Sequence, residues 1–371
     1  MTTGFFWDER CFWFGGGNYA FTMPVGGLVQ PFASGGLPEN PETKRRLKNL
    51  LDATGLMTEL APRAAPEASE EMLRRVHPAS YLEAFQAASA SGGGELGLRT
   101  PFGAGGYEQC ALSAGLAVEA LRAVMAGELR NAYALSRPPG HHCLPDFPNG
   151  FCLMANIAIA LEEARAVSAG MRAVVLDWDV HHGNGTEAIY LERADTLAIS
   201  IHQERNYPLD TGDFGVRGTG AGAGLNLNIP LPPGAGHATY MAVMEQIVIP
   251  QIRAFAPDVI VVACGYDAAA IDPLSRMMAT ADTFRQLAAQ VTALAEEICE
   301  GRLVAVHEGG YSEVYVPFCG HAVIEEMASA QSRPKAQAAD PFAETFAQRQ
   351  PGPAFQAFLD GQVAALREAL G

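Results

Sequence analysis

The chain has 371 residues, 49% hydrophobic and 18% charged, a balance typical of a folded, enzyme-sized protein and not of a disordered or fibrous one. Its formal net charge of −16 argues against sequence-independent binding to nucleic acid or to an anionic membrane, because both need clustered Lys and Arg. Its 7 cysteines are scattered and include no CxxC pair, which disfavours a disulfide framework and a thiolate zinc site and favours a reducing compartment.

The N-terminal segment is aromatic, but Asp8, Glu9 and Arg10 interrupt its apolar run and no basic leader precedes it, so it does not read as a signal peptide. No stretch reaches the ~18 uninterrupted apolar residues of a membrane helix. We therefore expect a cytoplasmic protein with no membrane partner. The aromatic residues 5–14 could make subunit contacts in a homo-oligomer, such as a dimer or tetramer.

Helices and β-rich runs alternate along most of the chain. A helix is predicted over residues 40–56, where Pro41 lies near the start and Gly55 near the end. Later helical patterns cover residues 157–171 and 241–255. The β-rich runs are residues 131–136, 172–177, 196–201, 225–230, 258–264 and 302–307. This alternation predicts an α/β fold with a mostly parallel sheet between helices.

The C-terminal part differs in composition. Residues 331–354 are rich in Pro, Gln and Ala and are expected to form a loose connection, followed by a helix over 355–370. This tail could pack on the rest of the chain or take part in oligomerisation. We expect a single domain over residues 1–371, with a core over about 20–330 and a C-terminal extension over 331–371.

Polar residues follow five of the predicted strands, and the carboxyl ends of strands in an open parallel sheet border the ligand crevice. Asp177, Asp179 and His181 are spaced by two, so they would share one side if the extended geometry continues. With Asp267, they offer carboxylates and an imidazole to a divalent cation. Such a set suits zinc, and also admits iron, cobalt or manganese. The alternative is that these residues only cap a strand end.

His141 and His142 follow a Pro-Pro-Gly turn, and a neutral imidazole is a natural general base for water activated by a metal. Each imidazole needs an orienting partner, and Asp177 and Asn184 are available for this. A Gly-Gly pair before Tyr311 could present its phenol to an oxyanion. Taken singly, each motif is also compatible with an ordinary core or surface position.

Aromatic residues could form a channel to the metal. Phe151 and Tyr207 are the candidates for its walls, although plain core packing is the alternative. Cys143 and Cys152 lie in the same region, but neither has the paired base that a nucleophilic cysteine needs. We interpret both cysteines as structural.

The motifs occur in a fixed order over roughly residues 20–330: RPPGHH, NGFC, LDWDVHHGNGT, a DAxxxDP run and EGGY. In this order and spacing they resemble the histone deacetylase superfamily, in particular the bacterial histone deacetylase-like amidohydrolases related to the class II enzymes. The resemblance implies an arginase-like, three-layer α/β fold. It also implies a zinc ion at the strand ends that serves hydrolysis of acetyl or related acyl groups on a lysine-like amine.

The resemblance also implies a role for each matching residue. His142 would be the general base and then the general acid, and His141 would be its electrostatic neighbour. The zinc ligands would be Asp179, His181 and Asp267. Asp177 and Asn184 would orient the two imidazoles, and Tyr311 would polarise the amide carbonyl. A structural potassium ion is implied near Asp177, Asp179, His181 and Ser200. The substrate channel would be formed by Gly150, Phe151, Tyr207, Leu274 and Gly309. His182 receives no chemical role.

Two positions depart from the family pattern. Tyr207 stands where Phe is often found, which makes the channel more polar. Leu274 stands where polyamine-specific relatives would carry an acidic residue, which favours acetyl-lysine-like substrates. The open alternatives are a hydrolase of acetylpolyamines or other small acyl amides on the same site, a non-catalytic binder of acyl ligands, and an arginase-like ureohydrolase, which would need two manganese ions and more bridging aspartates.

Overall fold

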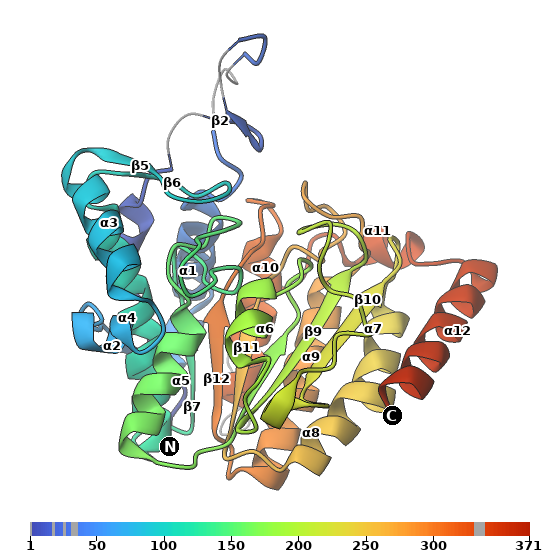
Figure 1. Cartoon of the computed structure of the whole chain (residues 1–371). Helices are drawn as coiled ribbons and strands as arrows, with labels where there is room; N and C mark the ends of the chain where they lie inside the picture. Colours follow the sequence, from blue (N-terminus) through green and yellow to red (C-terminus); the bar gives the residue numbers. More distant parts are fainter. Residues whose placement is uncertain (1, 17–18, 25–26, 31–35, 330–337) are drawn as a thin grey trace.

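A parallel sheet of eight strands forms the centre of the protein, with helices flanking it (Figure 1). The computed structural model describes residues 2–16, 19–24, 27–30, 36–329 and 338–371. The strand order is β10-β9-β8-β11-β12-β7-β1-β4. The strands span β1 Gly4–Phe6, β4 Ala61–Arg63, β7 Asn131–Ala134, β8 Ala173–Asp177, β9 Thr196–Gln203, β10 Asn226–Leu231, β11 Val259–Cys264 and β12 Leu303–His307.

The middle strands are apolar because both faces of the sheet are covered. Every residue of β8, β11 and β12 is buried, as a parallel sheet between helices requires. These strands and β7, β9 and β10 are the β-rich runs predicted from the sequence, and the predicted α/β fold is confirmed. Their carboxyl ends lie at the same edge, because neighbouring strands run parallel.

The N-terminal aromatic segment is internal. Phe5 and Phe6 belong to β1, which pairs with β4 and β7, and both side chains are buried. Cys11 and Phe12 are also buried, whereas Trp13 is 74% exposed. The buried residues of this segment pack inside the protein's own core, so the prediction that they make subunit contacts is wrong. The sheet also begins well before the predicted core boundary near residue 20.

The helices agree with the sequence patterns and add shorter ones. Glu42–Thr54 forms α1, and Gly55 ends it with a left-handed φ of 83°, a conformation that favours glycine. The other α-helices are α2 Glu70–Arg74, α3 Ala79–Ala90, α4 Gly106–Met125, α5 Asn156–Val167, α6 Asn184–Tyr190, α7 His237–Val243, α8 Ile249–Phe255, α9 Ala281–Ile298, α10 Val316–Ser329, α11 Ala343–Gln348 and α12 Pro353–Leu370.

The helix predicted over residues 241–255 is divided. A π-helical turn, Met244–Val248, separates α7 from α8. Pro250 lies at the start of α8 and has no N–H to continue the regular hydrogen-bond ladder, which accounts for the irregular turn before it. Among the described helices, none is long and apolar enough to cross a membrane.

The C-terminal extension packs on the rest of the chain. The stretch predicted to be loose, residues 331–354, contains helix α11, while residues 330–337 lie outside the described part. The predicted terminal helix is α12, which lies against α7 and β10 at one side of the molecule (Figure 1). Its Leu359 and Val363 are buried there. Of the two alternatives for this tail, packing is thus observed.

Two small antiparallel pairs lie outside the sheet, near the top of the view in Figure 1. One pair is β2 Tyr19–Ala20 with β3 Met23–Pro24, and the other is β5 Gly93–Glu95 with β6 Pro101–Gly103. The segments that connect their strands contain Phe21, Thr22 and Arg99, which line a cavity above the sheet. These pairs therefore help to form the entrance to that cavity.

Candidate active site

Two carboxylates and an imidazole converge beyond β8 and β11. One ligand atom from each of Asp179, His181 and Asp267 lies within 4.8 Å of the others. His181 Nδ1 is 3.0 Å from Asp179 Oδ1 and 3.0 Å from Asp267 Oδ2. All three side chains are buried. This donor set could hold a divalent cation.

The local electrostatics also favour a cation at this cluster. Burial acts to lower the pKa of His181, but the carboxylates of Asp267 and Asp179 outweigh it and raise that pKa to about 10. Backbone N–H groups orient the carboxylates: Gly309 N donates to Asp179 Oδ2 at 2.8 Å, and Val180 N donates to Asp267 Oδ1 at 2.7 Å. The cluster is thus held in place and attracts positive charge.

The histidine pair between β7 and α5 lies next to this cluster, and the two imidazoles have different partners. His141 Nδ1 is 2.9 Å from Asp177 Oδ2, and His142 Nδ1 is 2.7 Å from Asn184 Oδ1. Their ring centroids are 4.0 Å apart, and both side chains are buried. Because an amide oxygen only accepts, Nδ1 of His142 is the donor, which leaves its Nε2 free to accept a proton.

The two partners separate the proton affinities of the pair. Burial opposes a charge on His141, but the carboxylates of Asp179 and Asp177 outweigh it and raise its pKa well above the usual value. Burial, followed by the charges of His141 and His181, lowers the pKa of His142 well below the usual value. These pKa shifts favour the charged form of His141 and the neutral form of His142. A neutral imidazole with a free nitrogen is what a general base requires.

Two buried carboxyl groups, for which the sequence predicted no role, accept hydrogen bonds from the loops around the site and hold them in place. Glu308 accepts hydrogen bonds from the N–H groups of Gly140 at 2.7 Å and His141 at 3.1 Å, and burial raises its pKa to about 7. Asp272 accepts from the N–H groups of Tyr311 at 2.7 Å and Leu274 at 2.9 Å. Both lie in motifs visible in the sequence, EGGY and the DP pair, but nothing in the sequence showed which N–H groups they would bind.

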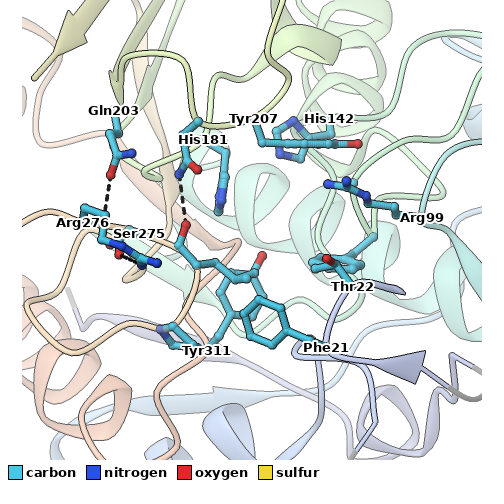
Figure 2. A pocket seen from close by; sticks show the side chains of 15 residues that line it. Phe21, Thr22, Arg99, His142, His181, Gln203, Tyr207, Ser275, Arg276 and Tyr311 are labelled. Atoms are coloured by element: carbon cyan, nitrogen blue, oxygen red, sulfur yellow. Dashed lines mark hydrogen bonds between the residues drawn. The ribbon is translucent and has the colours of Figure 1, made fainter. Parts of the chain in front are cut away.

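A cavity of about 320 Å³ leads to these residues (Figure 2). Figure 2 shows His142, His181 and Tyr311 around it. Tyr311 is only 8% exposed, and its ring centroid is 5.8 Å from that of Phe151 and 6.2 Å from that of His181. The lining residues are Phe21, Thr22, Arg99, His142, Gly150, Phe151, His181, Gln203, Asn206, Tyr207, Pro273, Leu274, Ser275, Arg276 and Tyr311.

Of the predicted channel residues, Gly150, Phe151, Tyr207 and Leu274 line the cavity, and Gly309 does not. Gly309 lies against the carboxylate cluster instead. A β-carbon there would approach Asp267 Oδ2 to 2.3 Å and Asp179 Oδ2 to 2.6 Å, so the close approach requires glycine. Gly309, two residues after β12, thus lies beside the carboxylate cluster and the Tyr311 hydroxyl, and its place in the channel stays a prediction.

Gly150 is required at the cavity wall for a similar reason. Its φ is 51°, and a β-carbon there would come within 2.4 Å of His142 Cδ2 and 2.8 Å of Tyr207 Cε1. The Tyr207 ring lies 5.2 Å from that of His142, at 85° to it, and its hydroxyl donates to Asn149 Oδ1. His142 is therefore enclosed between the backbone of Gly150, which has no side chain, and the ring of Tyr207.

The side chains of the four residues predicted to bind potassium do not all converge on one point. Ser200 lies opposite Asp177 in the β8–β9 register, and its Oγ is 2.9 Å from His202 Nδ1. A small cavity of about 10 Å³ borders Ser200 and Asp177. The side chains of Asp179 and His181 lie in the cluster with Asp267, so these two residues have only backbone oxygens to offer a second ion.

A carboxylate and imidazole cluster, a neutral imidazole and a phenol around one cavity are typical of a metal-assisted hydrolase. The family model described as "Histone deacetylase domain" matches residues 37–327, and the chain belongs to that family. It is 54% identical over 371 residues to the "Histone deacetylase-like amidohydrolase" of Pseudomonas aeruginosa, covering 100% of this chain and 96% of that protein.

Two relatives of lower sequence identity are also named deacetylases. The chain is 38% identical over 298 residues to the "Probable deacetylase" of Archaeoglobus fulgidus, covering 78% of this chain and 82% of the relative. It is 35% identical over 285 residues to the human "Polyamine deacetylase HDAC10", covering 74% of this chain and 42% of that protein. The crystal structure of the HDA15 HD domain superposes with a TM-score of 0.80 at 27% identity and covers 100% of this chain and 99% of that one.

Proposed function

We propose that the protein is a zinc-dependent amidohydrolase that removes acetyl or related short acyl groups from a lysine-like amine. The observation that carries this proposal is the intact set of groups around one cavity: the cluster of Asp179, His181 and Asp267, the neutral base His142, and the phenol of Tyr311. Family membership and the names of the relatives support the same reaction class.

The cluster would hold one zinc ion per chain. An imidazole nitrogen and two carboxylate oxygens are common zinc ligands, and three protein ligands leave a position open for water and substrate. Zinc bound in this way lowers the pKa of water in the open position and polarises carbonyl oxygens. The buried carboxylates and their backbone N–H donors fit this ion.

The protein's own groups then move the protons. Nε2 of His142 accepts a proton from the attacking water and later returns it to the departing amine. The carboxylates of Asp179 and Asp177 favour the protonated form of His141, and burial together with the charge of His141 keeps the pKa of His142 low. The hydroxyl of Tyr311 donates a hydrogen bond to the acyl oxygen as that oxygen becomes negative.

Two alternatives are less well supported. A non-catalytic acyl-ligand binder would tolerate damage to the base, the phenol or the metal ligands, and all of them are present. An acetylpolyamine hydrolase needs an anionic group for its cationic substrate, but no Asp or Glu occurs among the described residues that line the cavity. We therefore favour acyl-lysine-like substrates.

The decisive experiment combines metal analysis with turnover on a panel of acetyl, propionyl, butyryl and trifluoroacetyl lysine compounds and acetylputrescine. The proposal predicts about one zinc per chain, loss of turnover on chelation, and recovery when zinc is returned. Full turnover by protein freed of zinc would overturn the mechanism. Stoichiometric zinc without hydrolysis of any amide in the panel would overturn the activity.

We further propose a structural potassium ion at the small cavity between Asp177 and Ser200, bound largely by backbone oxygens. Replacing potassium with lithium should then lower the melting temperature, and an unchanged melting temperature would contradict the site. The cytoplasmic location and the homo-oligomeric state stay predictions from the sequence.

A further inference from the structure

The mouth of the cavity is basic, although the chain is acidic overall. Its lining includes two guanidinium groups, those of Arg99 and Arg276, and no Asp or Glu from the described residues, while the formal net charge of the chain is −16. Figure 2 shows the two arginines on opposite sides of the opening, with His142, His181 and Tyr311 also around it. The local charge therefore opposes the charge of the protein as a whole.

Arg99 is held in place without an anionic partner. It lies between β5 and β6, is partly buried, and its guanidinium lies 4.9 Å from the centroid of the Tyr207 ring. The nearby carboxylate of Glu95 already accepts hydrogen bonds from the hydroxyl of Tyr19 at 2.9 Å and from the N–H of Thr100 at 3.0 Å. Among the described residues, Arg99 makes no ion pair, so its charge is left for a ligand.

Arg276 is held in place by polar neighbours in a similar way. Its backbone N–H donates to Oε1 of the buried Gln203 at 2.7 Å, and its Nη1 donates to the carbonyl of Ser275 at 2.5 Å. The side chain is exposed, and no carboxylate of the described chain pairs with it. The loop is fixed, while most of the guanidinium donors face solvent at the mouth.

Two uncompensated cations at the opening of a cavity concentrate anions there and repel cations. Guanidinium groups also bind carboxylates through paired hydrogen bonds, which gives orientation as well as attraction. When an acyl group reaches Tyr311 and His142, the far end of a lysine-length amine lies at the mouth. A negative charge on that far end would meet the two arginines.

We propose that Arg99 and Arg276 form an anion-recognition rim that selects N-acyl amines bearing a carboxylate at the end remote from the acyl group. Acyl-lysine with a free C-terminal carboxylate belongs to this substrate class, and cationic N-acylpolyamines are rejected. This inference rests on the proposed amidohydrolase function and deepens it.

The test compares two substrates that differ only in charge at the far end: Nα-benzoyl-Nε-acetyl-lysine with a free carboxylate, and its carboxamide. In the wild-type protein, kcat/KM for the carboxylate should exceed that for the carboxamide on the order of five- to tenfold at low salt, and the ratio should fall as salt screens the charges. In the double variant Arg99→Gln, Arg276→Gln the ratio should approach one. Because the ratio is internal to each preparation, partial misfolding does not change it.

Arg172→Gln is the matched control. Arg172 is exposed and its guanidinium lies 4.1 Å from the centroid of the Phe255 ring, but it precedes β8, at the opposite end of the sheet from the cavity. This variant should keep the wild-type ratio. Equal kcat/KM values for the two substrates in the wild type, or a ratio unchanged in the double variant, would overturn the rim. Failure to hydrolyse either substrate, or any acyl amide, with zinc bound would instead overturn the proposed function.

Discussion

The two ends of the cavity carry opposite charges, and these charges differ in burial and in hydrogen-bond partners. At the floor, Asp179 and Asp267 are buried, and each accepts backbone N–H donors within the protein. At the rim, Arg99 is partly buried and Arg276 is exposed, and neither has an anionic partner in the described chain. A buried charge costs several kcal/mol unless it is compensated, whereas a charge in water costs little. The buried carboxylates of Asp179 and Asp267 therefore need a compensating positive charge, whereas the two arginines at the rim need no partner to be stable in water.

The largest expected effect is at the floor. Asp267→Asn removes one of the three proposed zinc ligands, so the zinc content should fall well below one per chain. Turnover should drop by about 10³-fold or more, since a catalytic zinc ion supplies several kcal/mol of transition-state stabilisation. Asp258→Asn, the same change at an exposed residue, is the control and should keep both. Full zinc and near-normal turnover in Asp267→Asn would remove Asp267 from the ligand set.

Tyr311→Phe should have the next largest effect. It removes the hydroxyl proposed to donate to the acyl oxygen, a loss of roughly 3 kcal/mol, or about 150-fold in kcat, while zinc should stay bound. Tyr190→Phe is a suitable comparison, because Tyr190 is a buried tyrosine of α6 that does not line the active-site cavity. If kcat of Tyr311→Phe matched the wild type, the phenol would have no part in the chemistry.

Asn184→Asp should shift the pH dependence of kcat/KM without abolishing activity. A general base must be neutral, so turnover falls as the pH drops through the pKa of His142. Burial and the charges of His141 and His181 hold that pKa low in the wild type. A carboxylate at position 184 favours the imidazolium and should shift the acid limb of kcat/KM upward by about 1 unit or more. An unchanged acid limb would show that the residue at position 184 does not control the pKa of His142.

The smallest expected effect is a change of selectivity at the rim. Leu274→Glu adds a carboxylate to the cavity that the two arginines line and should raise kcat/KM for acetylputrescine, relative to acetyl-lysine carboxylate, by a few-fold. The change stays small because Arg276 remains beside it and solvent screens the pair. A side-by-side kinetic assay measures this, and a relative rate that falls would show that charge does not govern entry.

The sequence predicted the floor far better than the rim. The floor residues directly follow β8 and β11, long apolar strands whose carboxyl ends must meet at one edge of a parallel sheet. Arg99 and Arg276 lie in irregular segments, and no periodicity says which way such segments fold. The strands β1 and β4 were missed for a related reason, because three residues are too few to show a pattern.

Spacing distinguished the adjacent histidines His181 and His182. His181 continues the two-residue spacing of Asp177 and Asp179, and of the two histidines only His181 reaches the cluster. The nitrogens of His182 lie 2.9 Å from Thr211 Oγ1 and 3.1 Å from Asn228 Oδ1, in a buried polar network beside the small cavity at Asp177 and Ser200 and outside the active-site cavity. The partners of His141 and His142 were predicted correctly as to identity, and the difference in charge between those partners explains why the two imidazoles behave differently.

The position of the small antiparallel pairs has one further consequence. Arg99 belongs to the connection between β5 and β6, which is not part of the central sheet, whereas every group assigned to the chemistry follows a sheet strand or begins a helix packed beside it. Replacing side chains in that connection should therefore change which molecules are admitted, while its backbone, whose Leu98 and Arg99 carbonyls accept hydrogen bonds from the N–H groups of Gly150 and Phe151, keeps the cavity wall in place. In such an architecture, new substrate preferences can arise through changes in a short surface segment while the reaction itself is inherited intact.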